Sequence, residues 1–315
     1  MAQSSTSNSE EQALAAVAHA SAIAVFLGPL IPALIWVIQR KKSPYVAFHA
    51  LQAMGYQMLS IWLLATVLPV AFILFPFVLV FMSGGGRELS NPEAAANIIV
   101  LGTWGILLGA FGLYAGIALA AALYCLVRRD FQYPFIGAKL GRLVGYSPAQ
   151  PTPLTEEGED RFLAAIAHST AIITLWGILF PALVWASEKE RSPFLRFQAL
   201  QAAIFQAIGT LAYFIGTGLY MLLVFGMMAV LMIGGRAATP EATIPAAALI
   251  ALPVLCLAFV GLLLGPLYFI LASWAALRIL RGRDYRYPVL GNFLARRQEA
   301  SSPGRAGSAP GSRAT

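Results

Sequence analysis

The side chains that could carry chemistry in this sequence are a few neutral polar groups inside long apolar runs. His19 and His168 each lie about one turn into such a run. A second set follows near residue 50, where helical spacing puts the polar side chains on one face or at its edge. Its members are His49, Gln52, Tyr56 and Gln57, and residues 149 positions later are Gln198, Gln201, Phe205 and Gln206.

Polar groups at membrane depth are costly and usually face a bundle interior or a water-filled cavity. Three interpretations stay open: hydrogen bonds between helices or placement near the head groups, a polar pathway or binding cavity, and metal or haem ligation. The first is favoured, and we expect no metal site and no cofactor. Because His49 is matched by Gln198, a role that needs imidazole in both places is disfavoured there, whereas His19 and His168 pass that test.

Enzyme signatures are missing from the sequence. It contains no HExxH, GxSxG or P-loop motif, and no carboxylate pair inside an apolar run. Cys125 and Cys256 lie within apolar runs and are interpreted as small buried hydrophobes. We therefore expect a protein that is not an enzyme.

The elements that position these residues are long apolar segments. Of 315 residues, 59% are hydrophobic and 11% are charged, against about 25% charged in soluble domains. Six stretches without Asp, Glu, Lys or Arg each exceed the roughly 20 residues that a membrane helix needs. They are Leu14–Ile38, Leu51–Met82, Ile98–Val127, Phe162–Ala186, Leu200–Ile233 and Ile244–Leu277. The sequence predicts an all-α, polytopic helical membrane bundle with about six transmembrane segments.

The two halves of the chain are copies of one three-segment repeat. Residues 13–57 and 162–206 are identical at 21 of 45 positions at an offset of 149, and the closing Arg129–Pro134 matches Arg283–Pro288 at an offset of 154. We divide the chain into a polar tail (1–11), membrane repeat 1 (12–142), a linker (143–160), membrane repeat 2 (161–295) and a disordered tail (296–315).

Two repeated dipeptides have a simple structural interpretation. Ser is a good N-cap and Pro suits the first helical position, so Ser43-Pro44 and Ser192-Pro193 are predicted to begin the second long helices. Proline ends a helix and tyrosine prefers the membrane interface. Tyr133-Pro134 and Tyr287-Pro288 are therefore predicted to stop and anchor the third segments.

These motifs also carry a family resemblance. The order is AxAH, a Pro-containing apolar helix, a basic loop, SPxxxFxALQA and a closing Tyr-Pro. It resembles a bacterial membrane-protein family of unknown function that is related to the channel subunit of the chloroplast inner-envelope import translocon (Tic-twenty-like). The resemblance covers nearly residues 12–294, in two tandem copies, and implies a small helical membrane bundle.

The orientation of the two repeats stays open. Three crossings per repeat give inverted copies and divide the 21 Lys and Arg residues as 12 and 9, whereas an even number gives parallel copies and divides them as 19 and 2. The positive-inside rule prefers the second layout. The layout with parallel copies requires the first segment of each repeat to enter and leave on one side of the membrane, bending near Pro32 and Pro181.

The net charge of +7 comes from short basic clusters beside apolar segments, which favour anionic lipid head groups over nucleic acid. We expect the lipid bilayer as the main partner, with membrane proteins or a homo-oligomer possible, and a multi-pass location in the cell membrane. Two functions compete: a translocon-like, channel-like or permease component, and a non-enzymatic scaffold or assembly factor that organises proteins or lipids.

Overall fold

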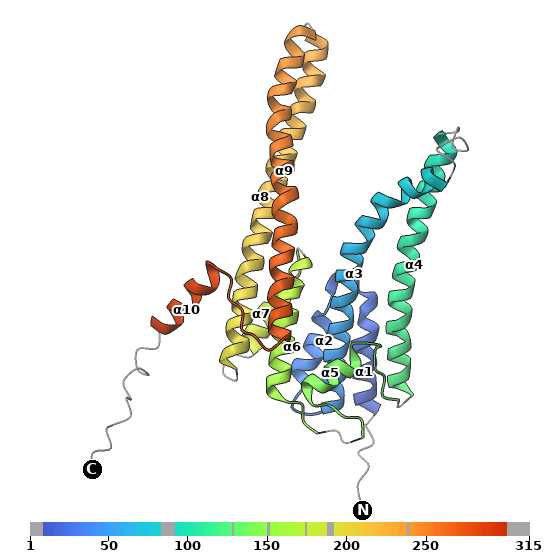
Figure 1. Cartoon of the computed structure of the whole chain (residues 1–315), viewed down its shortest axis with the longest axis vertical. Helices are drawn as coiled ribbons and strands as arrows, with labels where there is room; N and C mark the ends of the chain where they lie inside the picture. The colour runs from blue at the N-terminus through green and yellow to red at the C-terminus, as the bar shows by residue number, and fades with distance from the viewer. Residues whose placement is uncertain are drawn as a thin grey trace, which may run out of the picture. The chain divides into compact units, whose positions relative to one another are not determined.

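The computed structural model describes residues 9–82, 92–127, 129–149, 152–173, 175–187, 192–237 and 240–300. Over these ranges every regular element is helical and no strand forms. The chain folds as two compact units, Met1–Ile166 and Ala167–Thr315, here called the first and the second unit (Figure 1).

The helices follow one another in the same order in each unit. The first unit contains α1 (Ser9–Ala20), the short 3-10 turns η1 (Ser21–Ile23) and η2 (Val25–Leu27), α2 (Leu30–Gln39), α3 (Pro44–Met82), α4 (Pro92–Leu126) and α5 (Gly137–Val144). Helix α6 (Glu156–Ser169) crosses the boundary between the two units at Ile166, and the second unit continues with η3 (Thr170–Ile172), α7 (Leu179–Ser187), α8 (Pro193–Ala237), α9 (Pro240–Leu280) and α10 (Leu290–Ala300). Where the two repeats are compared, α6 is counted with the second unit.

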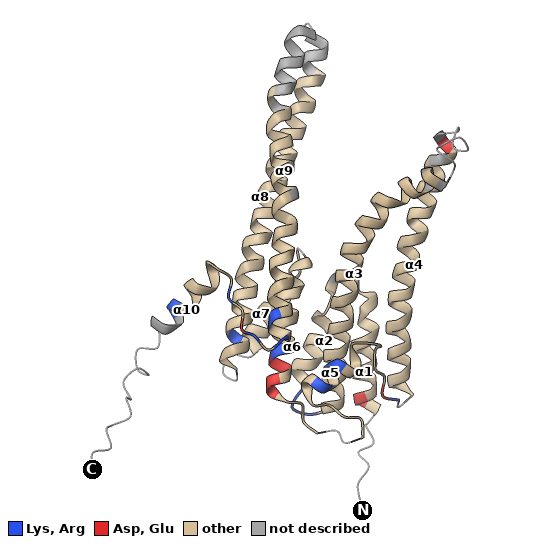
Figure 2. Ribbon diagram, viewed as in Figure 1, with Lys and Arg blue, Asp and Glu red and all other residues tan. Residues whose placement is uncertain are grey.

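Four of the described helices are long and apolar enough to cross a membrane. The candidate spans are Pro44–Val78, Ala96–Leu126, Pro193–Met232 and Ala251–Leu280. Each exceeds the roughly 20 residues that cover a hydrocarbon core, and large apolar side chains are exposed along all of them. Lysine and arginine gather at one end of the long helices in each unit (Figure 2). The protein is a multi-pass membrane protein.

The first apolar segment of each repeat is broken, so it is not the single helix that the sequence predicted. In the first unit the break lies at Gly28, whose φ of 48° favours glycine, and Pro29 follows without a backbone N–H. Helices α1 and α2 have 12 and 10 residues, about 18 and 15 Å. Neither covers the roughly 30 Å of a hydrocarbon core.

The two short helices form a folded-back pair. Ala15 packs on Ala122 and Cys125 near the end of α4, whereas Ala22 packs on Tyr114, which lies earlier in α4. Helix α1 therefore runs antiparallel to the last part of α4. Helix α2 packs along α3 and ends just before α3 begins. Both ends of the pair consequently lie beside the start of α3 and the end of α4.

The second unit repeats this break between α6 and α7. Gly177 lies in the turn, where a Cβ atom would collide with the carbonyl oxygen of Thr170. Gly28 and Gly177 occupy matching positions at the offset of 149. Each unit thus combines a broken short pair with two long helices. Among the described residues there are four candidate spans, so the six predicted transmembrane segments are not confirmed.

The long helices α3 and α8 begin at Pro44 and Pro193. The Oγ atom of Ser43 accepts a 3.3 Å hydrogen bond from the backbone N–H of Val46, and Ser192 Oγ accepts one of 3.1 Å from Leu195. These are N-cap contacts, which satisfy an amide that has no partner inside the helix.

The Tyr-Pro pairs do not stop the third segments. Helix α4 ends at Leu126 and α9 at Leu280, several residues before Pro134 and Pro288. The intervening residues form a loop that folds back onto the unit. Two predicted boundaries also differ: α6 begins at Glu156, inside the predicted linker, and α10 extends to Ala300, inside the predicted C-terminal tail. Residues 301–315 lie outside the described ranges.

Candidate functional site

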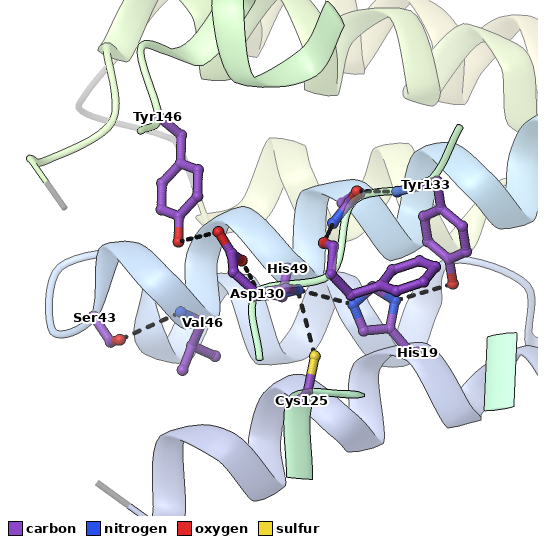
Figure 3. Close-up of polar contacts among 10 residues, drawn as sticks. His19, Ser43, Val46, His49, Cys125, Asp130, Tyr133 and Tyr146 are labelled. Carbon is purple, nitrogen blue, oxygen red and sulfur yellow. Dashed lines mark hydrogen bonds and ion pairs between the residues drawn. The ribbon is translucent and has the colours of Figure 1, made fainter. Parts of the chain in front are cut away.

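A line of hydrogen bonds crosses the interior of the first unit (Figure 3). His19 on α1 places Nδ1 3.0 Å from the Tyr133 hydroxyl and Nε2 3.0 Å from Nδ1 of His49 on α3. The other nitrogen of His49, Nε2, lies 2.8 Å from Oδ1 of Asp130. Both imidazoles are fully buried. Asp130 and Tyr133 belong to the loop after α4, so the line joins this loop to α1 and α3.

One arrangement of protons satisfies all of these contacts. A carboxylate only accepts, so a neutral His49 donates from Nε2–H to Asp130 and keeps Nδ1 as an acceptor. His19 Nε2–H then donates to His49, and His19 Nδ1 accepts from the Tyr133 hydroxyl. Burial lowers the pKa of His19 well below its usual value, and the neighbouring His49 lowers it further. His19 is therefore neutral at pH 7.

Cys125 completes a cluster around His49. Its Sγ atom lies 3.6 Å from His49 Nδ1, and ligand atoms of His19, His49 and Cys125 all lie within 4.8 Å of one another. All three residues are fully buried. Over the part of the chain that the structure describes, this is the one group of histidine, cysteine and carboxylate side chains with the spacing of a metal site.

Gln52 holds the backbone of the closing loop. Its Nε2 atom donates a 2.9 Å hydrogen bond to the carbonyl of Phe131, and its Oε1 accepts one of 2.7 Å from the N–H of Tyr133. One side-chain amide thus pairs with the loop as a neighbouring strand would. A Cβ at Gly137 would lie 2.7 Å from Gln52 Oε1, so the close approach requires glycine.

Gln57 fastens the break after α1. Its Nε2 atom donates to Ser21 Oγ at 3.0 Å and to the carbonyl of Ala18 at 3.4 Å. In the second unit Gln206 Nε2 donates to the carbonyl of Ala167 at 2.7 Å and to Thr170 Oγ1 at 3.2 Å. Both glutamines thus bind a carbonyl near the end of the short helix and the hydroxyl of the 3-10 turn that follows it.

The second unit rebuilds the line with different residues. His168 places Nδ1 3.1 Å from the Tyr287 hydroxyl and Nε2 3.0 Å from Gln198 Oε1. An amide oxygen only accepts, so His168 donates from Nε2 and accepts at Nδ1. Burial lowers the pKa of His168 to about 4, although the Gln198 hydrogen bond opposes the shift.

Gln201 takes the place of Gln52 in the second unit. Its Nε2 atom donates to the carbonyl of Tyr285 at 3.2 Å, and its Oε1 accepts a 2.9 Å bond from the N–H of Tyr287. Gln198 donates to the same carbonyl at 3.0 Å. A Cβ at Gly291 would collide with Gln201 Oε1, as one at Gly137 would with Gln52. In both units, a glutamine side-chain amide thus bonds to the backbone of the closing loop.

The sequence matches the magnetosome magnetite crystal formation protein family over residues 10–140 and again over residues 159–294. The two segments together cover most of the chain. The chain belongs to this family. It carries the family unit twice, in tandem. No curated protein and no solved structure matches the chain significantly.

The two family units differ where the first unit has its cluster. At the offsets of 149 and 154, the partners of His49 and Cys125 are Gln198 and Ile279. Ile279 is fully buried, like Cys125. The second unit therefore retains the hydrogen bonds of its histidine but replaces both other ligand atoms of the cluster.

Sequence reasoning missed two members of the site and the contacts of two others. Cys125 was interpreted as a small hydrophobe, and Asp130 only as a marker of the repeat. Tyr133 and Tyr287, expected at the membrane interface, are 2% and 3% exposed and point their hydroxyls at His19 and His168. The one available signal was the joint change of residues 49 and 125 between the two repeats.

Proposed function

We propose that this protein is a non-enzymatic membrane scaffold that takes part in magnetite crystal formation at a magnetosome membrane. The observation that carries the proposal is the match to the magnetosome magnetite crystal formation family over both units. Four apolar helices long enough to cross a bilayer support the membrane placement. The magnetosome membrane thereby replaces the cell membrane as the proposed location.

The distribution of polar groups in α3 favours a scaffold over a channel or permease. Polar residues of the site form hydrogen bonds within their own unit, so they act as connections between helices and loops. They also lie at one end of the long helices. Residues 61–82 of α3 contain Thr66 as their one hydroxyl or amide side chain, and its hydroxyl bonds to its own helix. A polar pathway needs groups through the whole depth of the bilayer.

We further infer that each unit enters and leaves the membrane on the same side. Two long helices and a folded-back pair give an even number of crossings. All of the 21 Lys and Arg residues except Arg87 and Arg236 then lie on the side of the chain termini. That asymmetry satisfies the positive-inside rule, and it favours contact between anionic head groups and the basic segments.

The test of the function is genetic and structural. In a host that builds magnetosomes, a fluorescent fusion of the full chain is expected to co-localise with magnetosome membranes. Deletion of the coding sequence is expected to change the size or shape of the magnetite crystals in electron micrographs while leaving the empty vesicles in place. Normal crystals after deletion would contradict the proposal. Selective solute flux through liposomes holding the purified protein would favour the channel or permease instead.

A further inference from the structure

We propose that the first unit binds one transition-metal ion, of the class represented by Zn²⁺, through His19 Nε2, His49 Nδ1 and Cys125 Sγ. This inference does not depend on the proposed function. It concerns a site that the second unit does not reproduce.

The spacing of the three atoms suits one small ion. A tetrahedral Zn²⁺ with bonds of about 2.0 Å to nitrogen and about 2.3 Å to sulfur holds two nitrogens about 3.3 Å apart and a nitrogen and a sulfur about 3.6 Å apart. His19 Nε2 and His49 Nδ1 are 3.0 Å apart, and His49 Nδ1 and Cys125 Sγ are 3.6 Å apart. The whole group spans at most 4.8 Å.

Residues behind the ligands orient them for a metal. Metal-binding histidines usually donate their other N–H to a carboxylate or another acceptor, which fixes the ring and the tautomer. His49 Nε2 has Asp130 Oδ1 at 2.8 Å, and the Tyr146 hydroxyl donates to Asp130 Oδ2 at 3.5 Å. His49 therefore presents an unprotonated Nδ1 to the cluster.

Binding requires two proton movements. The Cys125 thiol loses its proton to solvent and binds as thiolate. His19 exchanges its Nε2 proton for one on Nδ1, so that Nε2 binds the ion and Nδ1–H donates to the Tyr133 oxygen, 3.0 Å away. The hydroxyl can act either as donor or as acceptor, so the same contact serves the tautomers with and without the ion.

The donor set selects the class of ion. Two imidazoles and a thiolate suit Zn²⁺ and other borderline or soft ions, and they disfavour Mg²⁺ and Ca²⁺, which take oxygen ligands. Three protein ligands leave a tetrahedral ion one further position, which is the arrangement of zinc sites that stay open to water or a ligand. Asp130, whose side chain is 21% exposed, connects the buried cluster to the surface.

The second unit supplies the matched substitutions. Gln198 and Ile279 occupy the positions of His49 and Cys125, and both are buried in a unit of the same architecture. His49→Gln and Cys125→Ile therefore introduce residues that this fold already accommodates. Each substitution removes one of the three ligand atoms, and we expect little change in the helical structure.

The experiment is a Co²⁺ titration of the full chain in detergent, after chelation, in a Cys256→Ala background that leaves Cys125 as the one thiol. We expect one Co²⁺ per chain, with the charge-transfer absorption of a thiolate–cobalt bond, and full displacement by Zn²⁺. His49→Gln and Cys125→Ile are expected to abolish the absorption, and His168→Gln to leave it unchanged. Asp130→Asn, which removes the carboxylate that accepts from His49 Nε2, is expected to weaken metal binding about 10- to 100-fold.

Two results would overturn the proposal. One is the lack of a thiolate–cobalt band in the Cys256→Ala protein, which no folding defect in a ligand variant can explain. The other is a band of equal intensity in Cys125→Ile or His49→Gln chains that keep the helical circular dichroism of the parent. Dialysis against Zn²⁺ with elemental analysis gives an independent stoichiometry, for which zero or unsaturable binding also contradicts the site.

Discussion

The backbone N–H of Tyr133 donates a 2.7 Å hydrogen bond to the side-chain oxygen of Gln52. This contact ties the loop after α4 to the long helix α3. It also fixes the Tyr133 backbone, whose side chain carries the hydroxyl beside His19. Gln201 and Tyr287 form the same contact at 2.9 Å in the second unit. The repeated element of the fold is thus a buried amide that holds a loop, and the histidine line is built on that loop.

Replacement of this glutamine is expected to destabilise the protein. Gln52→Leu leaves the N–H of Tyr133 and the carbonyl of Phe131 without their side-chain partner. Each unsatisfied buried group costs about 1–3 kcal/mol. A lower thermal transition in detergent would show the effect. The control is Thr66→Val, which changes an exposed polar side chain to an apolar one on the same helix. Equal transition temperatures for both variants would contradict the role of Gln52.

Glycine at the contact with this glutamine is expected to be necessary. Gly137→Ala puts a Cβ 2.7 Å from Gln52 Oε1 and 3.0 Å from the backbone of Gln132, so the loop must shift and the amide contacts lengthen. We expect a loss of about 1–3 kcal/mol, as for other overpacked sites. Gly105→Ala is the matched control, because a Cβ there meets no atom within 4 Å. The prediction fails if the two alanine variants are equally stable.

The second unit is expected to lose stability in mild acid through His168. Its pKa is about 4 in the folded protein against the usual 6.5. The unfolded chain therefore takes up the proton first as the pH falls. The contribution of neutral His168 to the free energy of unfolding is present in full above pH 6.5 and declines between pH 6.5 and 4. It amounts to at most about 3 kcal/mol.

Thermal unfolding in detergent across that pH range measures this contribution. His168→Gln, which cannot be protonated, is expected to show a smaller loss of stability than the parent on going from pH 7 to pH 4. His168→Gln and parent curves that run parallel over the whole range would show that this imidazole does not contribute.

Sequence patterns predicted the helical membrane fold because apolar length alone indicates a membrane helix. They also located the repeat, since residues such as His19, Gln52 and the Ser-Pro pairs recur at fixed offsets. The break at Gly28 was harder to predict, because glycine and proline are common in unbroken membrane helices too. The packing of Ala15 and Ala22 along α4 shows that the chain turns back.

The site was predictable in part. The matched histidines and glutamines marked the correct interior, because polar side chains in apolar helices need partners. Their contacts with Asp130 and Cys125 were not predictable, since about 80 residues separate each of them from His49. Only the folded loop brings these side chains together. The contact of Tyr133 with His19 was missed for the same reason, because only the folded loop turns this side chain inward.

Cysteine accessibility from the two sides of the membrane tests the central architecture most directly. Single cysteines are placed at positions 42, 147, 190, 87 and 236 in a chain without Cys125 and Cys256. We predict that a membrane-impermeant thiol reagent labels positions 42, 147 and 190 from one side, and positions 87 and 236 from the other. Labelling of positions 42 and 190 from opposite sides would contradict two crossings per unit and support inverted three-span repeats.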